Sequence, residues 1–314
     1  MDDLRIAIVG IGATGAVLAA ALLKQDPDII LVDPRPGLGE AIRGDGITIS
    51  GQLTYHVPVR HFFDRIGMMK ALNPNFIFVS TKTFHLPKVL EELKSVFTAG
   101  TKIVSTHNGL GTEDLVAEAF GADAAFRMSL NYGVSLKGPG QVETAFFNRP
   151  NHLGSLTREN SELGSRIAAL LTEAGLDTEC VDDIKLYVWK KMVLKCTMAS
   201  LCAVTDRTLG EVLSFPPTRE IAENCFKEAI AVANAQGYDL GEDYMRNAMV
   251  YLERAGAHKD SMCYDIASKT PTEIDFLGGK VVEYGRQLGV STPFYVAMTN
   301  LVKAIEDSYL RKQQ

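Results

Sequence analysis

Short apolar runs alternate with stretches of helical length over the first 110 residues of the chain. Continuous runs rich in Ile, Val and Phe are typical of strands that are buried on both faces of a parallel sheet. Their alternation with helical stretches predicts a parallel sheet with helices on both faces. The predicted strands cover residues 4–9, 29–32, 75–80 and 102–105, and the predicted helices cover residues 12–25 and 86–97.

The pattern changes after residue 127. Residues 128–136 and 141–147 are predicted to form a hairpin-like β extension. They are joined through Lys137-Gly138-Pro139-Gly140, and Pro and Gly are the residues that turns favour. A helix over residues 161–174 and a strand over residues 178–181 are predicted to complete this part of the chain.

Almost no strand pattern follows residue 183. Asp182 and Asp183 are typical N-cap residues for a helix over residues 184–204, a segment without Pro or Gly. The later predicted helices each begin at a residue type that helix starts favour. They cover residues 217–236, 242–255, 272–287 and 293–311. We therefore expect an α/β fold with two domains, an α/β domain over residues 1–183 and an all-helical domain over residues 184–314.

Charge and cysteine content exclude several classes of protein. The chain has 32 Lys and Arg against 38 Asp and Glu, a net charge of −6, which disfavours nucleic acid and anionic membranes as partners. The five cysteines are odd in number and form no C-x-x-C pair, so we interpret them as reduced packing residues and expect no metal site. The acidic start and the absence of a long apolar run predict a cytoplasmic protein without a membrane partner.

A glycine motif lies between the first strand and the first helix. Gly10-Ile11-Gly12-Ala13-Thr14-Gly15 matches G-x-G-x-x-G in the strand-to-helix context that dinucleotide binding requires. Gly10 permits the tight turn, Gly12 lets a pyrophosphate approach the backbone, and Gly15 lets the helix pack on the strand. The helix start supplies unpaired N–H groups to the phosphates. The motif predicts a Rossmann-type dinucleotide-binding domain, with Gly10, Gly12, Ala13, Thr14 and Gly15 at the cofactor.

The end of the second strand bears on the choice of cofactor. Asp33 lies 18 residues after Gly15, where an acid accepts hydrogen bonds from the adenosine ribose and disfavours a 2′-phosphate. Arg35 is able to bind that phosphate instead. Asp33 favours NADH, and Arg35 leaves NADPH open. The competing interpretation of both residues is a solvated turn at Asp33-Pro34.

Two further segments follow strands at the edge of the sheet where ligands bind. Lys82 follows the strand at residues 75–80, and Asn108 follows the strand at residues 102–105. Both are placed to reach a nicotinamide or a substrate. The competing interpretations are a surface lysine and a turn at Asn108-Gly109. We interpret the neighbouring His107 as a packing or loop residue.

The long predicted helix carries Lys191 and Lys195 on one face. If one of these lysines is desolvated, the two ammonium groups repel each other, which lowers the pKa of a lysine toward the range useful for a general acid. The competing interpretation is a solvated basic stripe. Ser261 is a candidate for binding a carboxylate, although Ser is also a common N-cap. Glu273 lies at a predicted helix start, where the helix dipole alone favours an acid.

Taken together, these residues resemble the ketopantoate reductase family over nearly the whole chain. The more specific part is C-terminal: Trp189-Lys190-Lys191, Ser261-Met262 and, twelve residues after Ser261, Thr272-Glu273-Ile274-Asp275. The resemblance implies a Rossmann domain joined to an all-helical domain, an active site in the cleft between them, and reduction of a 2-oxo acid by a nicotinamide cofactor. Its N-terminal part comprises the glycine motif, Lys82, residues 107–111 and residues 138–140.

The resemblance also implies roles for individual residues. Lys191 matches the catalytic lysine that donates a proton to the ketone oxygen, and Glu273 matches the acid that orients this lysine and contacts the substrate. Ser261 matches a serine that binds the substrate carboxylate. Asn108 matches an asparagine near the nicotinamide and the substrate, and Lys82 matches a lysine near the cofactor.

Three positions depart from the family pattern. Lys195, Ala199 and Leu209 stand where ketopantoate reductases usually carry asparagines that hold the polar substrate. Ala199 and Leu209 make the predicted pocket more apolar, and Lys195, which we keep as a substrate-binding candidate, adds a charge. A site that loses such bonding groups loses much of its preference for a polar substrate.

Three hypotheses follow from the sequence. The first is an NAD(P)H-dependent reductase of a 2-oxo acid, with 2-dehydropantoate as one substrate. The second is an NAD-dependent D-2-hydroxyacid dehydrogenase that acts on apolar 2-oxo acids. The third is a non-catalytic dinucleotide sensor, and the spacing from Ser261 to Glu273 argues against a fourth reading as a β-hydroxyacid dehydrogenase. The expected partner is a small-molecule 2-oxo acid, and a homodimer stays open as an alternative to a monomer.

Overall fold

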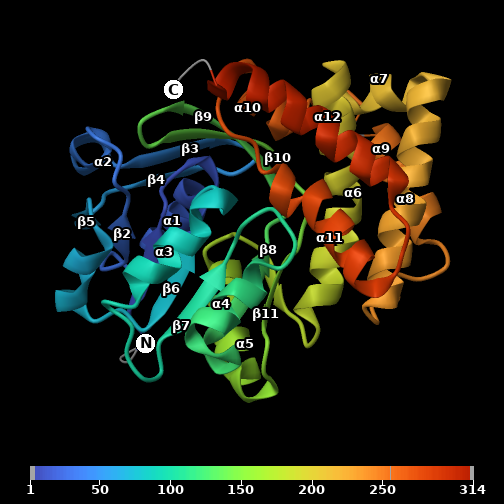
Figure 1. Cartoon of the computed structure of the whole chain (residues 1–314). Coiled ribbons are helices and arrows are strands. Elements are labelled where there is room, and N and C mark those ends of the chain that lie inside the picture. Colours follow the sequence, from blue (N-terminus) through green and yellow to red (C-terminus); the bar gives the residue numbers. More distant parts are fainter. Residues whose placement is uncertain (1–3, 255, 312–314) are drawn as a thin grey trace. The chain divides into compact units, whose positions relative to one another are not determined.

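The computed structural model describes residues 4–254 and 256–311 (Figure 1). These residues divide into two compact units. Residues 4–107 and 112–184 form an α/β unit, and residues 185–254 and 256–311 together with the short segment 108–111 form a helical unit. The α/β fold class with a C-terminal all-helical part is confirmed. Residue 255, the predicted end of one helix, lies outside the described residues.

The α/β unit is built on an eight-stranded sheet of order β12-β11-β8-β7-β6-β1-β2-β5. Strands β5, β2, β1, β6, β7 and β8 run parallel, which is the strand order of a Rossmann domain. Strand β11 pairs antiparallel with β8 and parallel with β12. The strands are β1 (Ile6–Val9), β2 (Ile30–Val32), β5 (His61–Phe63), β6 (Phe76–Val79), β7 (Lys102–Ser105), β8 (Ala125–Ser129), β11 (Asn151–Ser155) and β12 (Thr178–Cys180).

Helices cover both faces of this sheet, as predicted. Helices α1 (Ala13–Gln25) and α5 (Ser161–Glu173) share one apolar core with the large sheet. Helices α3 (Leu86–Leu93) and α4 (Thr112–Phe120) contribute to a second core on the other face. Residues 15–23 of α1 are all buried, because a second sheet covers the side of α1 that faces away from the first. The small alanines of this helix permit such close packing on two sides.

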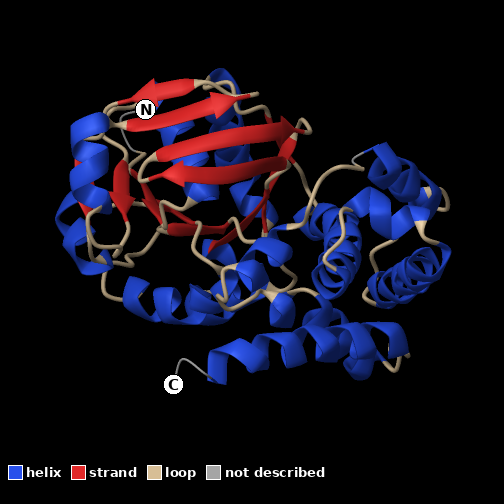
Figure 2. Cartoon of the chain, turned by 90° about the horizontal axis from the view of Figure 1, so that it is seen from above, coloured by secondary structure: helices blue, strands red, loops and turns tan. Residues whose placement is uncertain are grey.

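The second sheet has four strands in the order β4-β3-β10-β9 (Figure 2). Its strands are β3 (Ile47–Gly51), β4 (Tyr55–Val57), β9 (Tyr132–Gly138) and β10 (Gln141–Phe147). The predicted hairpin is present as β9 and β10, but the predicted strand over residues 128–136 is wrong. The first residues of this predicted strand form the end of β8 in the large sheet, and β9 begins only at Tyr132. Apolar residues continue through the change of sheet, so the pattern alone does not reveal the break.

Several short elements of this unit were not predicted. Strands β3, β4 and β5 have three to five residues, and β3 pairs with β10, which lies about 90 positions further along the chain. Such pairing depends on non-local packing rather than on the local pattern. The other unpredicted elements are α2 (Leu38–Asp45), α4, β11 and the 3₁₀ helices Ile66–Leu72, Thr83–His85, Ala122–Ala124 and Arg158–Asn160.

The helical unit contains the long helix α6 and six further α-helices. Its helices are α6 (Ile184–Thr205), α7 (Leu209–Ser214), α8 (Pro216–Ala235), α9 (Tyr244–Arg254), α10 (Ser261–Ala267), α11 (Gly278–Leu288) and α12 (Pro293–Leu310). Cys196, Cys202, Cys225 and Cys263 are buried here as packing residues. Among the described residues, no helix combines the length and the apolar character needed to cross a bilayer.

The predicted helix over residues 272–287 is wrong at its start. A 3₁₀ helix (Ile274–Phe276) comes first, and α11 begins only at Gly278 after a break in the backbone at Leu277. Gly278 is the first residue of α11, and a Cβ there would lie 2.7 Å from Thr299 Oγ1 of α12. The close contact between α11 and α12 therefore favours a residue without a side chain at this position.

Candidate functional site

The glycine motif adopts the backbone that a dinucleotide fingerprint requires. Gly10 has φ 94°, and a Cβ there would lie 2.8 Å from the backbone of Ser80 and Thr81. A Cβ at Gly15 would lie 1.9 Å from the carbonyl oxygen of Gly10. Packing within the α/β unit thus accounts for both of these glycines.

Gly12 differs, because a Cβ there would meet no described residue within 4 Å other than its own neighbours along the chain. It is also the N-cap residue of α1, and among the described residues no side chain caps that helix start. Helix α1 therefore begins without a side-chain cap, and Gly12 leaves space beside the positive end of this helix. This is the arrangement that accepts a pyrophosphate, so the residues present fit the dinucleotide that the motif predicts.

Asp33 and Arg35 bind each other. Asp33 is 4% exposed, and its two carboxylate oxygens accept hydrogen bonds from Ile11 N at 2.8 Å and from Arg35 N, Nε and Nη2 at 3.0, 2.8 and 2.8 Å. Arg35 Nη2 also donates to Ile11 O at 2.7 Å. Burial raises the pKa of Asp33, but these hydrogen bonds and the Arg35 charge outweigh burial and hold it below its ordinary value. The pair ties the end of β2 to the glycine loop.

A buried polar network that the sequence analysis missed lies beneath the loop after β7. Arg127 of β8 is 1% exposed, forms an ion pair with Glu113 of α4 at 3.3 Å and donates to Ser105 O at 3.2 Å and to the carbonyl oxygen of His107. His107 is also buried and contacts Ser105 Oγ at 2.9 Å and Thr81 Oγ1 at 3.2 Å. Burial, assisted by the Arg127 charge, lowers the pKa of His107 to about 3, so His107 stays neutral and packs, as expected.

Lys82 lies at the end of β6, as predicted, in the N-cap position of a 3₁₀ helix, and it is exposed. Its role at the cofactor stays a prediction. The next predicted segment, residues 108–111, belongs by its contacts to the helical unit.

The backbone of residues 108–111 lies against helical-unit side chains. Leu110 N donates to Phe276 O at 2.9 Å. Gly109 has φ 151°, and a Cβ there would lie 2.9 Å from Phe276 Cβ; a Cβ at Gly111 would lie 2.5 Å from Tyr284 Oη. The glycines of the Asn108-Gly109-Leu110-Gly111 motif are thus required by this close approach, which holds the position of Asn108.

Lys191 and Asn108 contact each other directly. Lys191 Nζ donates to Asn108 Oδ1 at 2.8 Å within the helical unit. Trp189, which is 2% exposed, anchors this part of α6 by donating from Nε1 to Gln236 Oε1 at 3.0 Å. The two residues predicted separately as catalytic and substrate-binding candidates are therefore brought together, with an ammonium held at a defined position.

Lys195 lies one turn further along α6. For this residue, the expectation that it is solvated or that it is destabilised by repulsion from Lys191 is wrong. Its Nζ donates to Asp260 Oδ1 and Oδ2 at 2.8 and 2.7 Å and to Ser261 Oγ at 2.8 Å. Burial lowers the pKa of Lys195, but the charge and hydrogen bonds of Asp260, with the charges of Glu273 and Asp265, raise it above its ordinary value overall. Asp260, the ion-pair partner that stabilises the charged form of Lys195, lies 65 positions away in sequence.

Two interpretations at the start of α10 and of the segment after it also need correction. Asp260, not Ser261, is the N-cap of α10, and its side chain accepts from Met262 N at 2.9 Å. Ser261 is the first helical residue, and it is exposed. Glu273 is the N-cap of a three-residue 3₁₀ helix rather than part of an α-helix start, so a helix dipole does not account for an acid there. Its action on Lys191 stays a prediction.

The two apolar residues that replace asparagines of the family pattern are both buried. Ala199 is fully buried on α6, and Leu209 is 6% exposed at the start of α7, where its N–H donates to His258 O at 3.0 Å. Both side chains pack inside the helical unit. The structure thus accommodates apolar groups at positions where the family pattern has amides.

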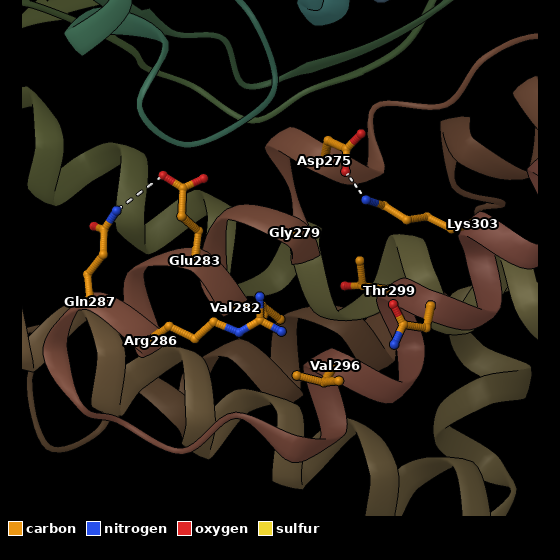
Figure 3. A pocket seen from close by; sticks show the side chains of 10 residues that line it. Asp275, Gly279, Val282, Glu283, Arg286, Gln287, Val296, Thr299 and Lys303 are labelled. Atoms are coloured by element: carbon orange, nitrogen blue, oxygen red, sulfur yellow. Dashed lines mark hydrogen bonds and ion pairs between the residues drawn. The ribbon is translucent and has the colours of Figure 1, made fainter.

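A cavity of about 530 Å³ lies between α11 and α12 (Figure 3). Three of its charged lining residues form ion pairs: Asp275 pairs with Lys303, and Glu283 pairs with Lys280. The described residues that line it include none of the predicted site residues, so the predicted chemistry is not located there. In the described part of the chain, no three His, Cys, Asp or Glu side chains are grouped to hold a metal ion.

Comparison with known proteins identifies relatives of both units. Residues 6–158 match the family model described as "Ketopantoate reductase PanE/ApbA", and residues 183–306 match "Ketopantoate reductase PanE/ApbA C terminal". A 2-dehydropantoate 2-reductase of Streptococcus pyogenes is 29% identical over 301 residues, which cover 95% of this chain and 97% of that protein.

Solved structures with the same fold include two informative relatives. A 2-dehydropantoate 2-reductase from Geobacter metallireducens is 26% identical, with a TM-score of 0.88 over 96% of this chain and 99% of that chain. A D-mandelate dehydrogenase, solved with NADH and anilino(oxo)acetate, shares the fold at 24% identity, with a TM-score of 0.85 over 98% of this chain and 99% of that chain.

Proposed function

The chain belongs to the ketopantoate reductase family, and on this premise we propose that it is an NAD(P)H-dependent oxidoreductase that reduces a 2-oxo acid to a 2-hydroxy acid. The observation that carries the proposal is the hydrogen bond of 2.8 Å between Lys191 Nζ and Asn108 Oδ1. It holds an ammonium at the position that the family pattern assigns to the general acid. The spacing of Ser261 and Glu273 supports the same assignment.

The chemistry of the side chains agrees with this role. A bound reduced nicotinamide supplies a hydride to the carbonyl carbon. The Lys191 ammonium stabilises the negative charge that develops on the carbonyl oxygen and gives that oxygen its proton, after which solvent reprotonates the amine. Ser261 donates to the substrate carboxylate. Asn108 keeps Lys191 in place through its amide oxygen.

For the substrate, 2-dehydropantoate is the first candidate, because the family models and curated relatives carry that activity in their names. A second candidate is an apolar 2-oxo acid, as in a D-2-hydroxyacid dehydrogenase. Ala199 and Leu209 favour this second candidate, because they stand where the family pattern has amides that would hold a hydroxylated substrate.

The test is turnover by the purified protein. We expect oxidation of a reduced nicotinamide with 2-dehydropantoate or with a branched or aromatic 2-oxo acid, followed by absorbance at 340 nm. A more efficient reaction with the apolar acid would assign the second candidate. Tight cofactor binding without turnover in either direction would contradict an enzyme and support a dinucleotide sensor.

We further propose that NADH is the preferred cofactor. Arg35 donates hydrogen bonds from Nε and Nη2 to Asp33 and Ile11, so its guanidinium is already paired within the protein. The negative charge of the Asp33 carboxylate disfavours the 2′-phosphate of NADPH. Asp33→Asn removes this charge but retains an acceptor for Ile11 N. We expect the ratio of kcat/KM for NADH to that for NADPH to fall by roughly tenfold, the effect of about 1.4 kcal/mol.

The control for cofactor choice is Arg35→Ala. Removal of the Arg35 side chain leaves the Asp33 carboxylate without its ion-pair partner. The carboxylate then repels a 2′-phosphate more strongly, so we expect the use of NADPH to fall and the use of NADH to stay within a few-fold of the wild type. An unchanged cofactor ratio in Asp33→Asn, together with loss of NADH use in Arg35→Ala, would contradict the preference.

A further inference from the structure

Lys195, Asp260 and Ser261 form a closed cluster in the helical unit. Lys195 and Asp260 have side chains that are only 15% and 8% exposed, and their ion pair closes at 2.7 Å. Ser261 Oγ accepts from the same ammonium at 2.8 Å. Lys195 departs from the family pattern, so this cluster is a feature of this chain that its family membership does not explain.

The hydrogen bonds of Lys195 account for all of its donors. An ammonium group has three N–H donors, and Lys195 meets three acceptors, the two oxygens of Asp260 and the hydroxyl of Ser261. A substrate carboxylate would have to displace one of these partners to reach Lys195. The geometry therefore argues against Lys195 as a direct ligand of the substrate, the role that the sequence suggested.

Ser261 is the member of the cluster that a ligand can reach. A hydroxyl has one hydrogen to donate, and Lys195 engages the oxygen of Ser261 from one side. Within the described residues, its hydrogen is directed to Asp260 Oδ1 at 3.5 Å, the long limit of a hydrogen bond. Ser261 is exposed, so its hydrogen is available to a stronger acceptor such as a carboxylate.

Further negative charge surrounds the cluster. The charges of Glu273 and Asp265, together with that of Asp260, raise the pKa of Lys195. Burial lowers the pKa of His258 nearby and favours its neutral form, so His258 adds no positive charge. Lys195 is thus the cation that balances this group. Without it, the carboxylate of Asp260 would repel an anionic ligand at Ser261.

We propose that Lys195 is a positioning residue for Ser261: it orients the Ser261 hydroxyl to donate to a substrate carboxylate, and it cancels the charge of Asp260 beside that hydroxyl. This inference rests on the proposed function as a 2-oxo acid reductase. It assigns the selection of an anionic substrate to a buried ion pair that does not itself touch the substrate.

The test compares a 2-oxo acid that the wild type reduces with the uncharged 2-oxo amide that has the same side chain. In Lys195→Met, we expect KM for the acid to rise by roughly 10- to 100-fold with kcat changed less, the effect of losing a hydrogen bond to a charged group. We expect kcat/KM for the amide to change by less than about threefold. Lys190→Met, a neighbouring lysine on α6 with its ammonium over the Tyr187 ring, is the matched control and should behave like the wild type.

Two variants separate positioning from direct binding. In Lys195→Met/Asp260→Asn, neither charge is present, and KM for the acid should return to within several-fold of the wild type. Asp260→Asn alone should leave this KM unchanged or lower it, because the cation remains. Circular dichroism of each variant shows whether the helical unit remains folded.

Three outcomes would overturn the inference. If the double variant binds the acid as poorly as Lys195→Met alone, cancelling the charge of Asp260 is not the role of Lys195. If the acid and the amide lose activity equally, the pair has a structural role only. If the wild type turns over no 2-oxo acid, the proposed function fails together with the inference, whereas the first two results leave the proposed function intact.

Discussion

Lys191→Ala is expected to lower kcat for 2-oxo acid reduction by about 10²- to 10⁴-fold, the range typical of losing a positioned general acid. The ammonium that Asn108 Oδ1 holds at 2.8 Å is the group that would neutralise the developing alkoxide. The affinity for the reduced cofactor should stay within a few-fold of the wild type, because the glycine motif lies in the α/β unit. Single-turnover kinetics and a fluorescence titration with NADH would measure the two effects.

Two further variants define the role of Lys191. Lys191→Arg retains the charge but titrates far too high to give up a proton readily, so it should remain nearly as slow as Lys191→Ala if proton transfer limits the rate. Lys190→Ala, the adjacent residue, should retain activity. Wild-type turnover in Lys191→Ala would contradict the assignment of Lys191, and equal loss in both alanine variants would indicate a general disturbance of α6.

Glu113→Ala is expected to reduce the free energy of unfolding by about 3–5 kcal/mol, because it leaves the Arg127 charge buried without its partner. Arg127 and Glu113 have side chains that are only 1% and 4% exposed, and no solvent replaces the lost carboxylate. The same change should loosen the loop after β7, since Arg127 donates to Ser105 O and to the carbonyl oxygen of His107. Urea unfolding followed by circular dichroism would measure the shift in midpoint.

The control is Glu118→Ala on the same helix. Glu118 is exposed, and the described part of the structure shows no ion pair for it, so its midpoint should match the wild type. Replacing both buried partners, as Arg127→Met/Glu113→Met, should recover much of the stability, because the uncompensated charge is gone. Equal midpoints for Glu113→Ala and Glu118→Ala would show that the ion pair is dispensable.

Local chemistry explains why the cofactor loop could be predicted. Gly15 is required by a contact with the carbonyl oxygen of Gly10, five residues earlier, and Gly10 has the positive φ of the tight turn between the strand and the helix. Both requirements are local in sequence, although Gly10 also lies against the backbone of Ser80 and Thr81. The apolar strands of the parallel sheet are buried on both faces and therefore appear as continuous runs. The second sheet was harder to predict, because β3 and β10 are short, distant in sequence and define each other only when paired.

The candidate site shows the same division at the level of side chains. Lys191 and Asn108 could each be proposed from a motif, but their contact joins residues 83 positions apart. For Lys195, the local pattern indicated repulsion from Lys191, and the residue that determines its environment is Asp260. Asp260, Arg127 and Glu113 belong to no motif that could be recognised in the sequence.

The sequence by itself therefore determined the fold class, the glycine loop at the start of α1 and the identity of the residue types available for chemistry. These follow from backbone preferences and from apolar periodicity, which act over a few neighbouring residues. The tertiary structure decided which charges are neutralised, which hydroxyl is oriented and which apolar run belongs to which sheet. Those outcomes depend on burial and on partners distant along the chain, because the free energy of a charge depends on every group that replaces its water.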